Sequence, residues 1–390
     1  MFKEQRLCNR NFILACLCNL AFCLSFHMII PVLPLYFTEE LGVSRSLTGA
    51  AVSIFSLAAL MTRPVAGFLV DSFQRKPVFL LCIIPFGIFT SGYYFLTSLA
   101  LLTLLRFGHG ASFSACQTLL STVAVDHIPV NKMGTGIGIF GVIVSVSMAL
   151  GPMIGLEIAK LHSFDAAFIV SACVAIIACA FGMAIRMKKV EKPVKVTQKN
   201  FKLADFMFKP GLWLALCLAL PTATFGLLTN YIALFALEKG LSDATGPFFL
   251  VFAAGMIVSR LVSSPLLDRG FFMLVAILGK VIIFTSVLLY IYAWSPLILY
   301  GAASLAGIGY GLIFPAYQTR LLQLAPDSQK GMANSTYFLA CDIGIGLAIF
   351  LGGMIADLTS LTFMYWMGAI FIAISAVMLF FHTCPQTDHR

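Results

Sequence analysis

Arg63-Pro-Val-Ala-Gly-Phe-Leu-Val-Asp71 closes an apolar run that begins near residue 46, and Arg260-Leu-Val-Ser-Ser-Pro-Leu-Leu-Asp268 closes another run 197 residues later. Each run is long enough to cross the ~30 Å hydrocarbon core of a bilayer as a helix. The spacing from arginine to aspartate is the same in both stretches. This pair of stretches predicts a membrane protein whose second half repeats the first.

Similar apolar runs fill most of the chain. We expect helices near residues 11–37, 46–70, 78–97, 98–124, 133–159, 164–185, 211–236, 245–267, 271–293, 296–324, 332–356 and 361–381. Of all residues, 60% are hydrophobic and 11% are charged, whereas the surface of a soluble protein needs more polar side chains. The sequence therefore predicts an all-α membrane protein with 12 transmembrane helices.

The net charge of +9 is distributed as in a membrane protein. If the N-terminus is cytoplasmic, 20 of the 25 Lys and Arg residues lie in cytoplasmic loops or at cytoplasmic helix ends. This positive-inside bias fixes the topology of multi-pass proteins. We expect a protein of the plasma (inner) membrane with both termini in the cytoplasm, in contact with the lipid bilayer and not with nucleic acid.

The longest polar stretch predicts a cytoplasmic linker over residues 187–209, between six-helix bundles at 1–186 and 210–390. A further match supports the duplication: Gly108-His-Gly110 in the first half corresponds to Gly309-Tyr-Gly311 in the second, at an offset of 201. Two similar bundles around a central site are typical of secondary transporters, because the bundles can expose that site to each side in turn.

No stretch of the chain predicts catalysis or a cofactor. Most of the 11 cysteines lie in apolar runs, where cysteine behaves as a small hydrophobic residue. No Cys and His spacing fits a metal site, and no HExxH motif, Walker loop or nucleophile–base pair occurs. We expect no cofactor, no metal and no enzymatic activity.

The loop after the second predicted helix is Gly67-Phe-Leu-Val-Asp71-Ser-Phe-Gln-Arg75-Lys76. It resembles the signature that the major facilitator superfamily carries between helices 2 and 3. The resemblance implies a cytoplasmic gate, in which Asp71 meets the positive end of the helix that starts near Gly331. The alternative is that Asp71 and Arg75 only end a helix in water. The predicted gate residues are Gly67, Asp71, Arg75, Lys76 and, in the second half, Asp268 and Arg269.

The fourth predicted helix contains Leu102-Thr-Leu-Leu-Arg106-Phe-Gly-His109-Gly110. This segment is similar to the helix-4 motif of the same superfamily, with His109 where glutamine is usual. An arginine inside a membrane span costs at least ~2.5–3.5 kcal/mol, so it normally faces a wet cavity or a partner. Phe113 and Gln117 share its helix face and would line that cavity. The alternative is that Arg106 snorkels to the outer surface.

The fifth predicted helix carries Gly138, Ser147, Gly151, Pro152 and Gly155. This pattern resembles the motif of the 12-helix drug–proton antiporter branch, with serine at one glycine position. The resemblance implies efflux, as in multidrug exporters. Small residues allow close helix packing and proline bends the helix. Uptake of a small metabolite, by proton symport or facilitated diffusion, and a lipid or lysolipid flippase stay open as alternatives.

Two ionisable residues in apolar runs are candidates for the proton pathway. Asp342 lies in the middle of the eleventh run, where a carboxylate must be paired, hydrated or protonated; a structural ion pair with Lys280 is the alternative. His27 replaces the acidic residue that the antiporter branch often has in the first helix, and histidine titrates near physiological pH. Asn19 lies on the same stripe as His27, although a packing role for His27 is equally open.

Aromatic and polar residues at helical spacing complete the predicted pathway. They are Phe225 and Thr229 in the seventh run and Tyr310, Phe314 and Tyr317 in the tenth. Such stripes also arise from ordinary helix packing. If these residues line the cavity, the substrate is amphipathic and not a sugar. We therefore expect a monomeric alternating-access transporter that couples protons to the export of a small amphipathic organic molecule.

Overall fold

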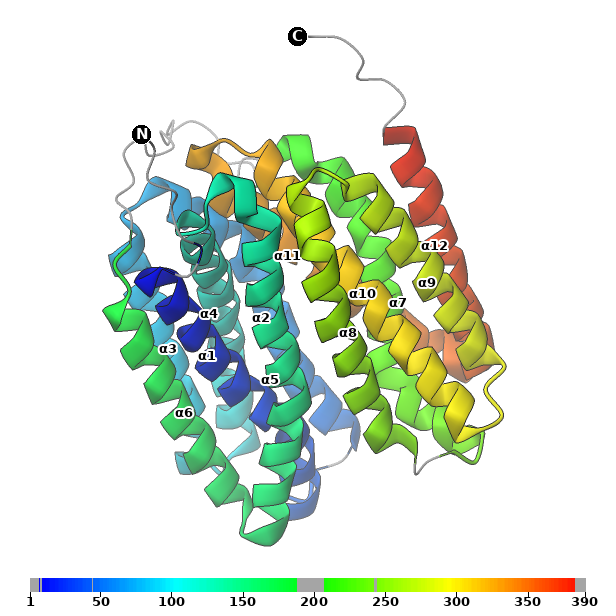
Figure 1. Ribbon diagram of the computed structural model, residues 1–390. Helices are drawn as coiled ribbons and strands as arrows, with labels where there is room; N and C mark the ends of the chain where they lie inside the picture. Colours follow the sequence, from blue (N-terminus) through cyan, green and yellow to red (C-terminus); the bar gives the residue numbers. More distant parts are fainter. Residues whose placement is uncertain (1–6, 8, 44, 188–206, 242–243, 383–390) are drawn as a thin grey trace, which may run out of the picture. The chain divides into compact units, whose positions relative to one another are not determined.

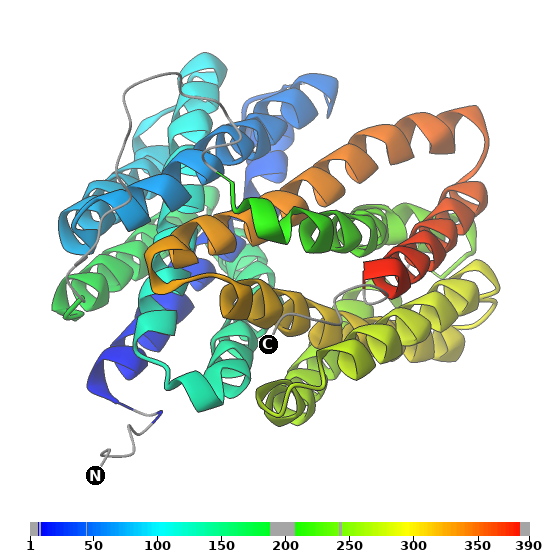
Figure 2. The same cartoon turned by 90° about the horizontal axis from the view of Figure 1, so that it is seen from above.

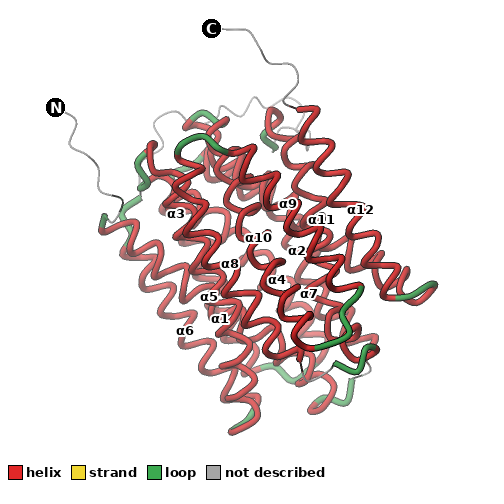
Figure 3. The backbone as a smooth tube through the Cα atoms, turned by 45° about the vertical axis from the view of Figure 1, so that its right-hand side comes forward, coloured by secondary structure: helices red, strands yellow, loops and turns green. Residues whose placement is uncertain are grey.

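The computed structural model describes residue 7 and residues 9–43, 45–187, 207–241 and 244–382. Throughout these residues the long regular elements are α-helices, and strands are absent (Figure 3). Twelve α-helices occur in the described part of the chain, one for each predicted run. Eleven of them are long and apolar enough to cross a membrane by length and composition, counting described residues only. The expected all-α membrane fold is confirmed.

The helix bounds follow the apolar runs (Figure 1). They are α1 Arg10–Leu35, α2 Arg45–Ser72, α3 Arg75–Phe95, α4 Leu99–Asp126, α5 Met133–Leu161, α6 Phe164–Ala184, α7 Leu212–Glu238, α8 Thr245–Asp268, α9 Phe272–Ile291, α10 Pro296–Leu324, α11 Lys330–Leu358 and α12 Leu361–His382. Four short helical turns occur in the described part of the chain: η1 Tyr36–Glu40, η2 Val130–Lys132, η4 Lys209–Gly211 and η6 Asp327–Gln329. Most of the predicted linker and both chain ends lie outside the described residues.

Capping residues and glycines set several helix ends. The Asn9 side chain accepts a hydrogen bond from the Phe12 amide at 3.0 Å and so caps α1. Ser163 caps α6 in the same way, through the Ala166 amide at 3.1 Å. Gly270 follows α8 with φ at +85°, a left-handed conformation that glycine adopts without a steric penalty. These residues thus mark where α1 and α6 begin and where α8 ends.

The chain forms two compact units. The first contains residues 1–136, 143–207 and 325–335, and the second contains 137–142, 208–324 and 336–390. The units therefore differ from the predicted halves by two short segments, one from α5 and one at the start of α11. Small residues in these segments allow close packing, because a Cβ on Gly138 would lie 1.7 Å from Ser264 Oγ of the second unit.

Each unit uses the same helix pairings (Figures 1 and 2). In the first unit α4 packs on α2 and α3, and α6 packs on α1 and α3. In the second unit α10 packs on α8 and α9, and α12 packs on α7 and α9. Every pairing of the first unit thus has its counterpart six helices later, which is the arrangement that a duplicated six-helix bundle requires.

The register between the halves is uniform over α2–α4 and α8–α10. A Cβ on Gly110 would lie 2.4 Å from the Phe55 carbonyl oxygen, and a Cβ on Gly307 would lie 2.0 Å from that of Phe252. Gly307 and Phe252 each lie 197 residues after their counterparts, Gly110 and Phe55. The ring contacts Tyr93–Phe168 and Tyr290–Tyr365, with centroids 5.9 Å and 6.2 Å apart, show the same shift. With α2 and α8 aligned at 197, helix packing pairs Gly110 with Gly307 and not with Gly311, to which the sequence offset of 201 joins it.

Candidate functional site

The Asp71 carboxylate lies at the N-terminal end of α11, inside the first unit. Its Oδ1 accepts a hydrogen bond from the Gly331 amide at 2.9 Å, and its Oδ2 accepts one from the Met332 amide at 2.8 Å. Asp71 is only 1% exposed. The negative charge therefore meets the positive end of the helix dipole out of contact with water, where the interaction is strongest.

Close approach of α2 and α11 depends on Gly67. A Cβ at this position would lie 2.4 Å from Ser335 Cβ and 2.9 Å from the Gly331 carbonyl oxygen. No larger residue fits without moving one helix. Gly67 therefore brings Asp71, one helical turn later, within reach of the two amides that it binds.

A buried polar network continues from this contact along α2 and α4. Ser335 Oγ donates to the Arg63 carbonyl oxygen, and Arg63 Nη2 donates to Gln117 Oε1 at 2.9 Å. Asn334 Nδ2 donates to Thr122 Oγ1 at 3.3 Å. Sequence reasoning placed Gln117 beside Arg106, but the structure joins it to Arg63. The missed signal was Arg63 itself, a charged residue inside an apolar run.

The basic residues after Asp71 have different partners. Arg75 forms an ion pair with Asp126 at the end of α4. Lys76 Nζ donates to the carbonyl oxygens of Gly182, Met183 and Ile185 at 3.1, 2.6 and 3.0 Å, so it caps the C-terminal end of α6. In the second unit Asp268 ends α8 and is half-buried, while Arg269 is exposed.

Arg106 is enclosed in the N-terminal half of α4. Its residue is 3% exposed, and its guanidinium carbon lies 4.5 Å from the centre of the Phe55 ring. Arg106 Nε and Nη1 are buried and have no hydrogen-bond partner among the described residues. An unpartnered buried donor of this kind costs ~1–3 kcal/mol, more for a charged group. Two donors of this buried cation thus lack an acceptor among the described residues.

Phe113 belongs to a cluster of rings beside Arg106. Its ring centre lies 4.0 Å from that of Phe26, 4.8 Å from that of Phe22 and 5.5 Å from that of Phe55. We call Phe22, Phe26, Phe55, Phe86 and Phe113 the first aromatic cluster. Because Phe55 contacts both Arg106 and Phe113, the cationic group and the apolar rings form one continuous region.

The predicted stripe on α1 is joined by hydrogen bonds along the helix. His27 Nδ1 donates to the Cys23 carbonyl oxygen at 2.7 Å, and Cys23 Sγ donates to Asn19 Oδ1 at 3.5 Å. Asn19 is buried and His27 is half-buried. A Cβ on Gly151 would lie 2.5 Å from His27 Cβ, so this side of α1 packs on α5.

The glycine-rich pattern of α5 makes two kinds of close contact. Gly151 and Gly155 pack on α1, since a Cβ on Gly155 would lie 2.3 Å from the Met28 carbonyl oxygen. Ser147 Oγ donates to the Leu20 carbonyl oxygen at 3.4 Å, and Pro152 is half-buried one residue after Gly151. Gly138 lies in the segment of α5 that packs on α8 in the second unit. There Arg260 donates to the Gly141 carbonyl oxygen.

The predicted aromatic residues of the second unit separate into two groups. Phe225 contacts Tyr310 and Phe314, with ring centres 5.0 Å and 5.5 Å away. Thr229, one turn along α7, donates to the Phe225 carbonyl oxygen at 2.9 Å. Tyr317 instead contacts Phe272 at 5.5 Å. Helical spacing suggested one stripe, but successive positions on α10 face α7 and α9 separately.

Two ionisable residues of the second unit differ in burial. Lys280 of α9 is 1% exposed; its Nζ donates to the Ser375 carbonyl oxygen at 2.7 Å and lies 5.4 Å from the Tyr317 ring centre. Asp342 of α11 is half-buried. The structure thus gives Lys280 a backbone partner on α12.

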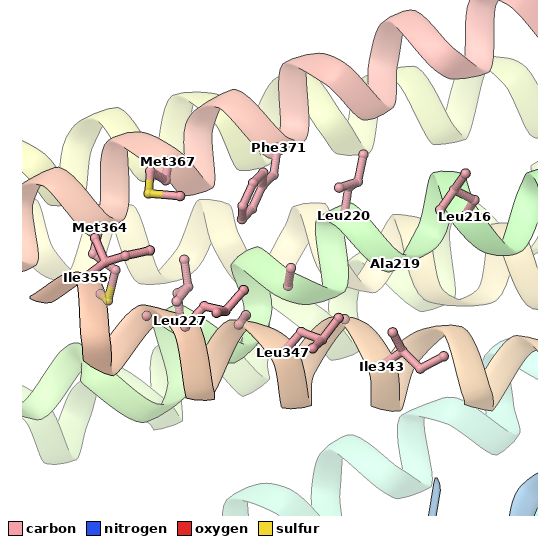
Figure 4. Close-up of a pocket in the computed structure, with 15 residues that line it drawn as sticks. Leu216, Ala219, Leu220, Leu227, Ile343, Leu347, Ile355, Met364, Met367 and Phe371 are labelled. Atoms are coloured by element: carbon pink, nitrogen blue, oxygen red, sulfur yellow. The ribbon is translucent and has the colours of Figure 1, made fainter.

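An apolar cavity of about 260 Å³ lies among α7, α11 and α12 of the second unit (Figure 4). Its walls carry aliphatic side chains, two methionines and one phenylalanine. The lining residues are Leu216, Ala219, Leu220, Ala223, Leu227, Ile343, Gly344, Leu347, Ala348, Leu351, Gly352, Ile355, Met364, Met367 and Phe371. The space is partly open, since Leu216, Leu347 and Leu351 of its lining are exposed, and its apolar walls suit apolar groups.

Groups of three or more His, Cys, Asp or Glu side chains that could hold a metal are absent from the described residues. Sequence reasoning also missed Tyr93 of α3. Its hydroxyl lies 2.9 Å from His109 Nδ1, and its side chain interacts with Arg106. The 197-residue register could have identified it, because Tyr290 occupies the equivalent position in the second half.

Comparison with known proteins identifies the family. The model of the Major Facilitator Superfamily matches residues 15–349 and 282–390. The chain is 28% identical over 375 residues to the uncharacterized MFS-type transporter YhhS of Escherichia coli (strain K12), covering 92% of this chain and 89% of that protein. It is 20% identical over 353 residues to the staphylopine export protein of Staphylococcus aureus, covering 88% of each chain.

Solved structures show the same fold. The human organic anion transporter MFSD10 (TETRAN) aligns with a TM-score of 0.82 at 16% identity, covering 97% of this chain and 100% of that one. FucP in the outward conformation aligns with a TM-score of 0.77 at 13% identity, covering 98% and 100%. The twelve helices, the paired bundles and the family match lead to one conclusion: the chain belongs to the Major Facilitator Superfamily, a family of membrane transporters.

Proposed function

We propose that this transporter exports a small amphipathic organic molecule with an anionic group, in exchange for protons, across the plasma (inner) membrane. The observation that carries the proposal is the buried Arg106 guanidinium, whose Nε and Nη1 have no hydrogen-bond partner in the described residues. An anionic group on the cargo would satisfy these donors. The first aromatic cluster beside it would hold the apolar part of the same molecule.

Proton coupling is assigned to the ionisable residues within the spans. In this proposal Asp342 carries the proton and His27 assists. Each charge that crosses the membrane contributes ~2.3 kcal/mol per 100 mV, which is enough for a more than tenfold substrate gradient. Proton and cargo then bind alternately, so that loading of one releases the other.

The contact between Asp71 and the first amides of α11 acts as the cytoplasmic gate in this scheme. Its two hydrogen bonds form when the carboxylate and the helix end meet, and they break when the two separate. Charge-assisted bonds to a helix N-terminus are strong yet limited to the first turn. Such a contact can therefore hold one side closed and still release it during each cycle.

Two comparisons support the direction and the charge of the cargo. A relative of this chain is a staphylopine export protein, and a protein of the same fold is an organic anion transporter. The motif of α5, with Gly151 and Pro152, resembles that of drug–proton antiporters. We extend these properties to this chain as part of the proposal.

Inverted membrane vesicles test the proposal directly. Candidate organic anions and neutral amphipathic drugs are added to acidified vesicles that contain a pH-sensitive dye. An exported cargo should release protons from the vesicles, and this release should be lost in Arg106→Ala and Asp342→Asn. Lys160→Ala, which changes an exposed residue at the end of α5, serves as the matched control. Proton-coupled transport that survives both substitutions would contradict the assignment, and activity confined to right-side-out vesicles would indicate uptake.

The apolar cavity of the second unit favours one other function, a lysolipid flippase. A space of about 260 Å³ lined by aliphatic side chains suits a hydrocarbon chain better than a polar drug. Reconstituted protein would then move a fluorescent lysophospholipid between bilayer leaflets, measured by protection of the label from a membrane-impermeant quencher. An unchanged rate relative to protein-free liposomes would exclude this function.

A further inference from the structure

Arg106 is one end of a buried series of polar side chains in α3 and α4. Tyr93 interacts with the Arg106 side chain, and its hydroxyl lies 2.9 Å from His109 Nδ1. His109 Nε2 lies 3.4 Å from Thr90 Oγ1, which is 2.8 Å from the Phe86 carbonyl oxygen. Each of these four side chains belongs to a residue that is at most 3% exposed.

The hydrogen bond from Thr90 to the Phe86 carbonyl determines which group donates and which accepts in the other contacts. A hydroxyl carries one proton, and Thr90 must donate it to the Phe86 carbonyl, which can only accept. Thr90 Oγ1 therefore accepts from His109, so the proton of the neutral imidazole is on Nε2. Nδ1 is then an acceptor, and the Tyr93 hydroxyl donates to it. The Tyr93 oxygen then keeps its lone pairs as acceptors, and the Tyr93 side chain interacts with Arg106.

The hydrogen bond that Tyr93 donates to His109 affects the neighbouring Arg106 guanidinium. Tyr93, with which Arg106 interacts, is held by its hydrogen bond to His109 and cannot turn away without losing that bond. The guanidinium also lies over the Phe55 ring. These two neighbours restrict the guanidinium, whose Nε and Nη1 lack hydrogen-bond partners among the described residues.

The second half of the chain shows that the fold does not require this arrangement. In the 197-residue register Tyr93 corresponds to Tyr290, which keeps the equivalent ring contact with Tyr365. Ala306 stands in place of His109, and Ala303 stands in place of Arg106. Both alanines are buried in the same helix packing. The tyrosine thus occurs in both halves, as Tyr93 and Tyr290, whereas His109 and Arg106 occur only in the first half.

We propose that His109 is a positioning residue for the cargo site: through Tyr93 it orients the Arg106 guanidinium toward a carboxylate of the transported molecule. The inference rests on the proposed function, since it takes an anionic cargo as given. It adds that discrimination between a carboxylate and a neutral group depends on a residue that does not touch the cargo.

Conservative and disruptive variants test the role of His109. Glutamine has an acceptor and a donor on one amide, so His109→Gln can accept from Tyr93 and donate to Thr90. His109→Ala removes both functions, and Tyr93→Phe removes the link to Arg106. Tyr290→Phe is the matched control, because it makes the same change at the equivalent position of the second half.

The probes are 2-naphthoate and 2-naphthamide, which differ only in the charged group. Their affinities are measured with purified full-length protein in nanodiscs. The preference of the wild-type protein for naphthoate should fall about tenfold in His109→Ala and Tyr93→Phe, since a charge-assisted contact loses its geometry. It should stay within about twofold of wild type in His109→Gln and Tyr290→Phe. A preference that survives in Tyr93→Phe, or that is lost equally in His109→Gln, would overturn the proposal.

A spectroscopic measurement separates this inference from the function on which it rests. In protein with ¹⁵N-labelled histidine, the signal that disappears in His109→Gln should have the shifts of the Nε2–H tautomer. The opposite tautomer would overturn the positioning role whatever the cargo is. A wild-type protein that binds both probes equally, with the expected tautomer, would instead contradict the anionic cargo of the proposed function.

Discussion

Asp71 and Gly331 are 260 residues apart in the sequence, yet the carboxylate of the first accepts a hydrogen bond of 2.9 Å from the amide of the second. A second bond to the Met332 amide holds the other carboxylate oxygen. The contact joins the end of α2 to the start of α11. Two buried, charge-assisted bonds at one point make it a strong yet local connection.

Asp71→Asn should slow transport at least tenfold, because the amide lacks the charge that the helix dipole stabilises and can keep only one acceptor at the two amides. Cargo affinity should change by less than about threefold, since the contact lies away from Arg106. Transport rates in vesicles and equilibrium binding to purified protein measure the two effects.

Asp165→Asn is the matched control for this change. Asp165 also lies in the first turn of a helix, α6, but it is exposed. Loss of the Asp165 charge should lower the stability of the protein by a few tenths of a kcal/mol at most and leave transport unchanged. A gate role for Asp71 would be contradicted by equal rates in the two variants.

Gly67→Ala should destabilise the protein by about 1–3 kcal/mol, because the added methyl group meets Ser335 and forces α2 and α11 apart. Thermal unfolding in detergent measures the loss. Gly301→Ala provides the comparison, since Gly301 lies inside α10 with open space where the methyl group would go. Alanine favours the helix there, so this control should be neutral or gain up to about 1 kcal/mol. Equal effects of the two substitutions would show that the close approach at Gly67 is unimportant.

Lys76→Met should lower stability by about 1–3 kcal/mol, because three carbonyl oxygens at the end of α6 lose their donor. Lys76→Arg should retain most of the stability. Lys160→Met, at the exposed end of α5, should have little effect. Each variant is followed by thermal unfolding and by the transport rate of the folded fraction. A transport defect in Lys76→Met that exceeds the loss of folded protein would support the predicted role of this residue in the gate.

Ala223→Leu should stabilise the second unit, because Ala223 lines the apolar cavity and the added groups fill empty space. Within the membrane the gain comes from van der Waals contacts, and about 0.5–2 kcal/mol is expected where the leucine fits without strain. The same variant should block any binding of a lysophospholipid in this cavity. Ala254→Leu, at an exposed position of α8, is the control. Lysophospholipid binding that persists in Ala223→Leu would place the hydrocarbon chain elsewhere.

The sequence predicted the helices well because a membrane span is a property of composition and length. The predicted run at 296–324 coincides with α10, and the other runs lie within a few residues of their helices. Side-chain partners were harder to predict. Gln117 and Arg106 share a helix face, but Gln117 binds Arg63 of α2 and Arg106 lies over Phe55. Spacing along one helix cannot say which neighbouring helix each turn meets.

Lys76 shows the same difficulty at a helix end. Sequence similarity grouped it with Asp71 and Arg75, because the three residues form one motif. In the structure its long side chain reaches the last carbonyl oxygens of α6, whose bounds a single sequence does not fix closely. Tyr317 was likewise assigned to the pathway by its helical spacing, whereas its ring lies against Phe272.

The constant shift of 197 residues gives this protein an internal reference. Each side chain in α2–α4 can be compared with one that experiences the same packing in α8–α10, within the same molecule and membrane. A saturation mutagenesis map of the whole chain should therefore look symmetric wherever a position only supports the bundle. We expect positions at which the two copies respond differently, such as His109 against Ala306, to act in transport.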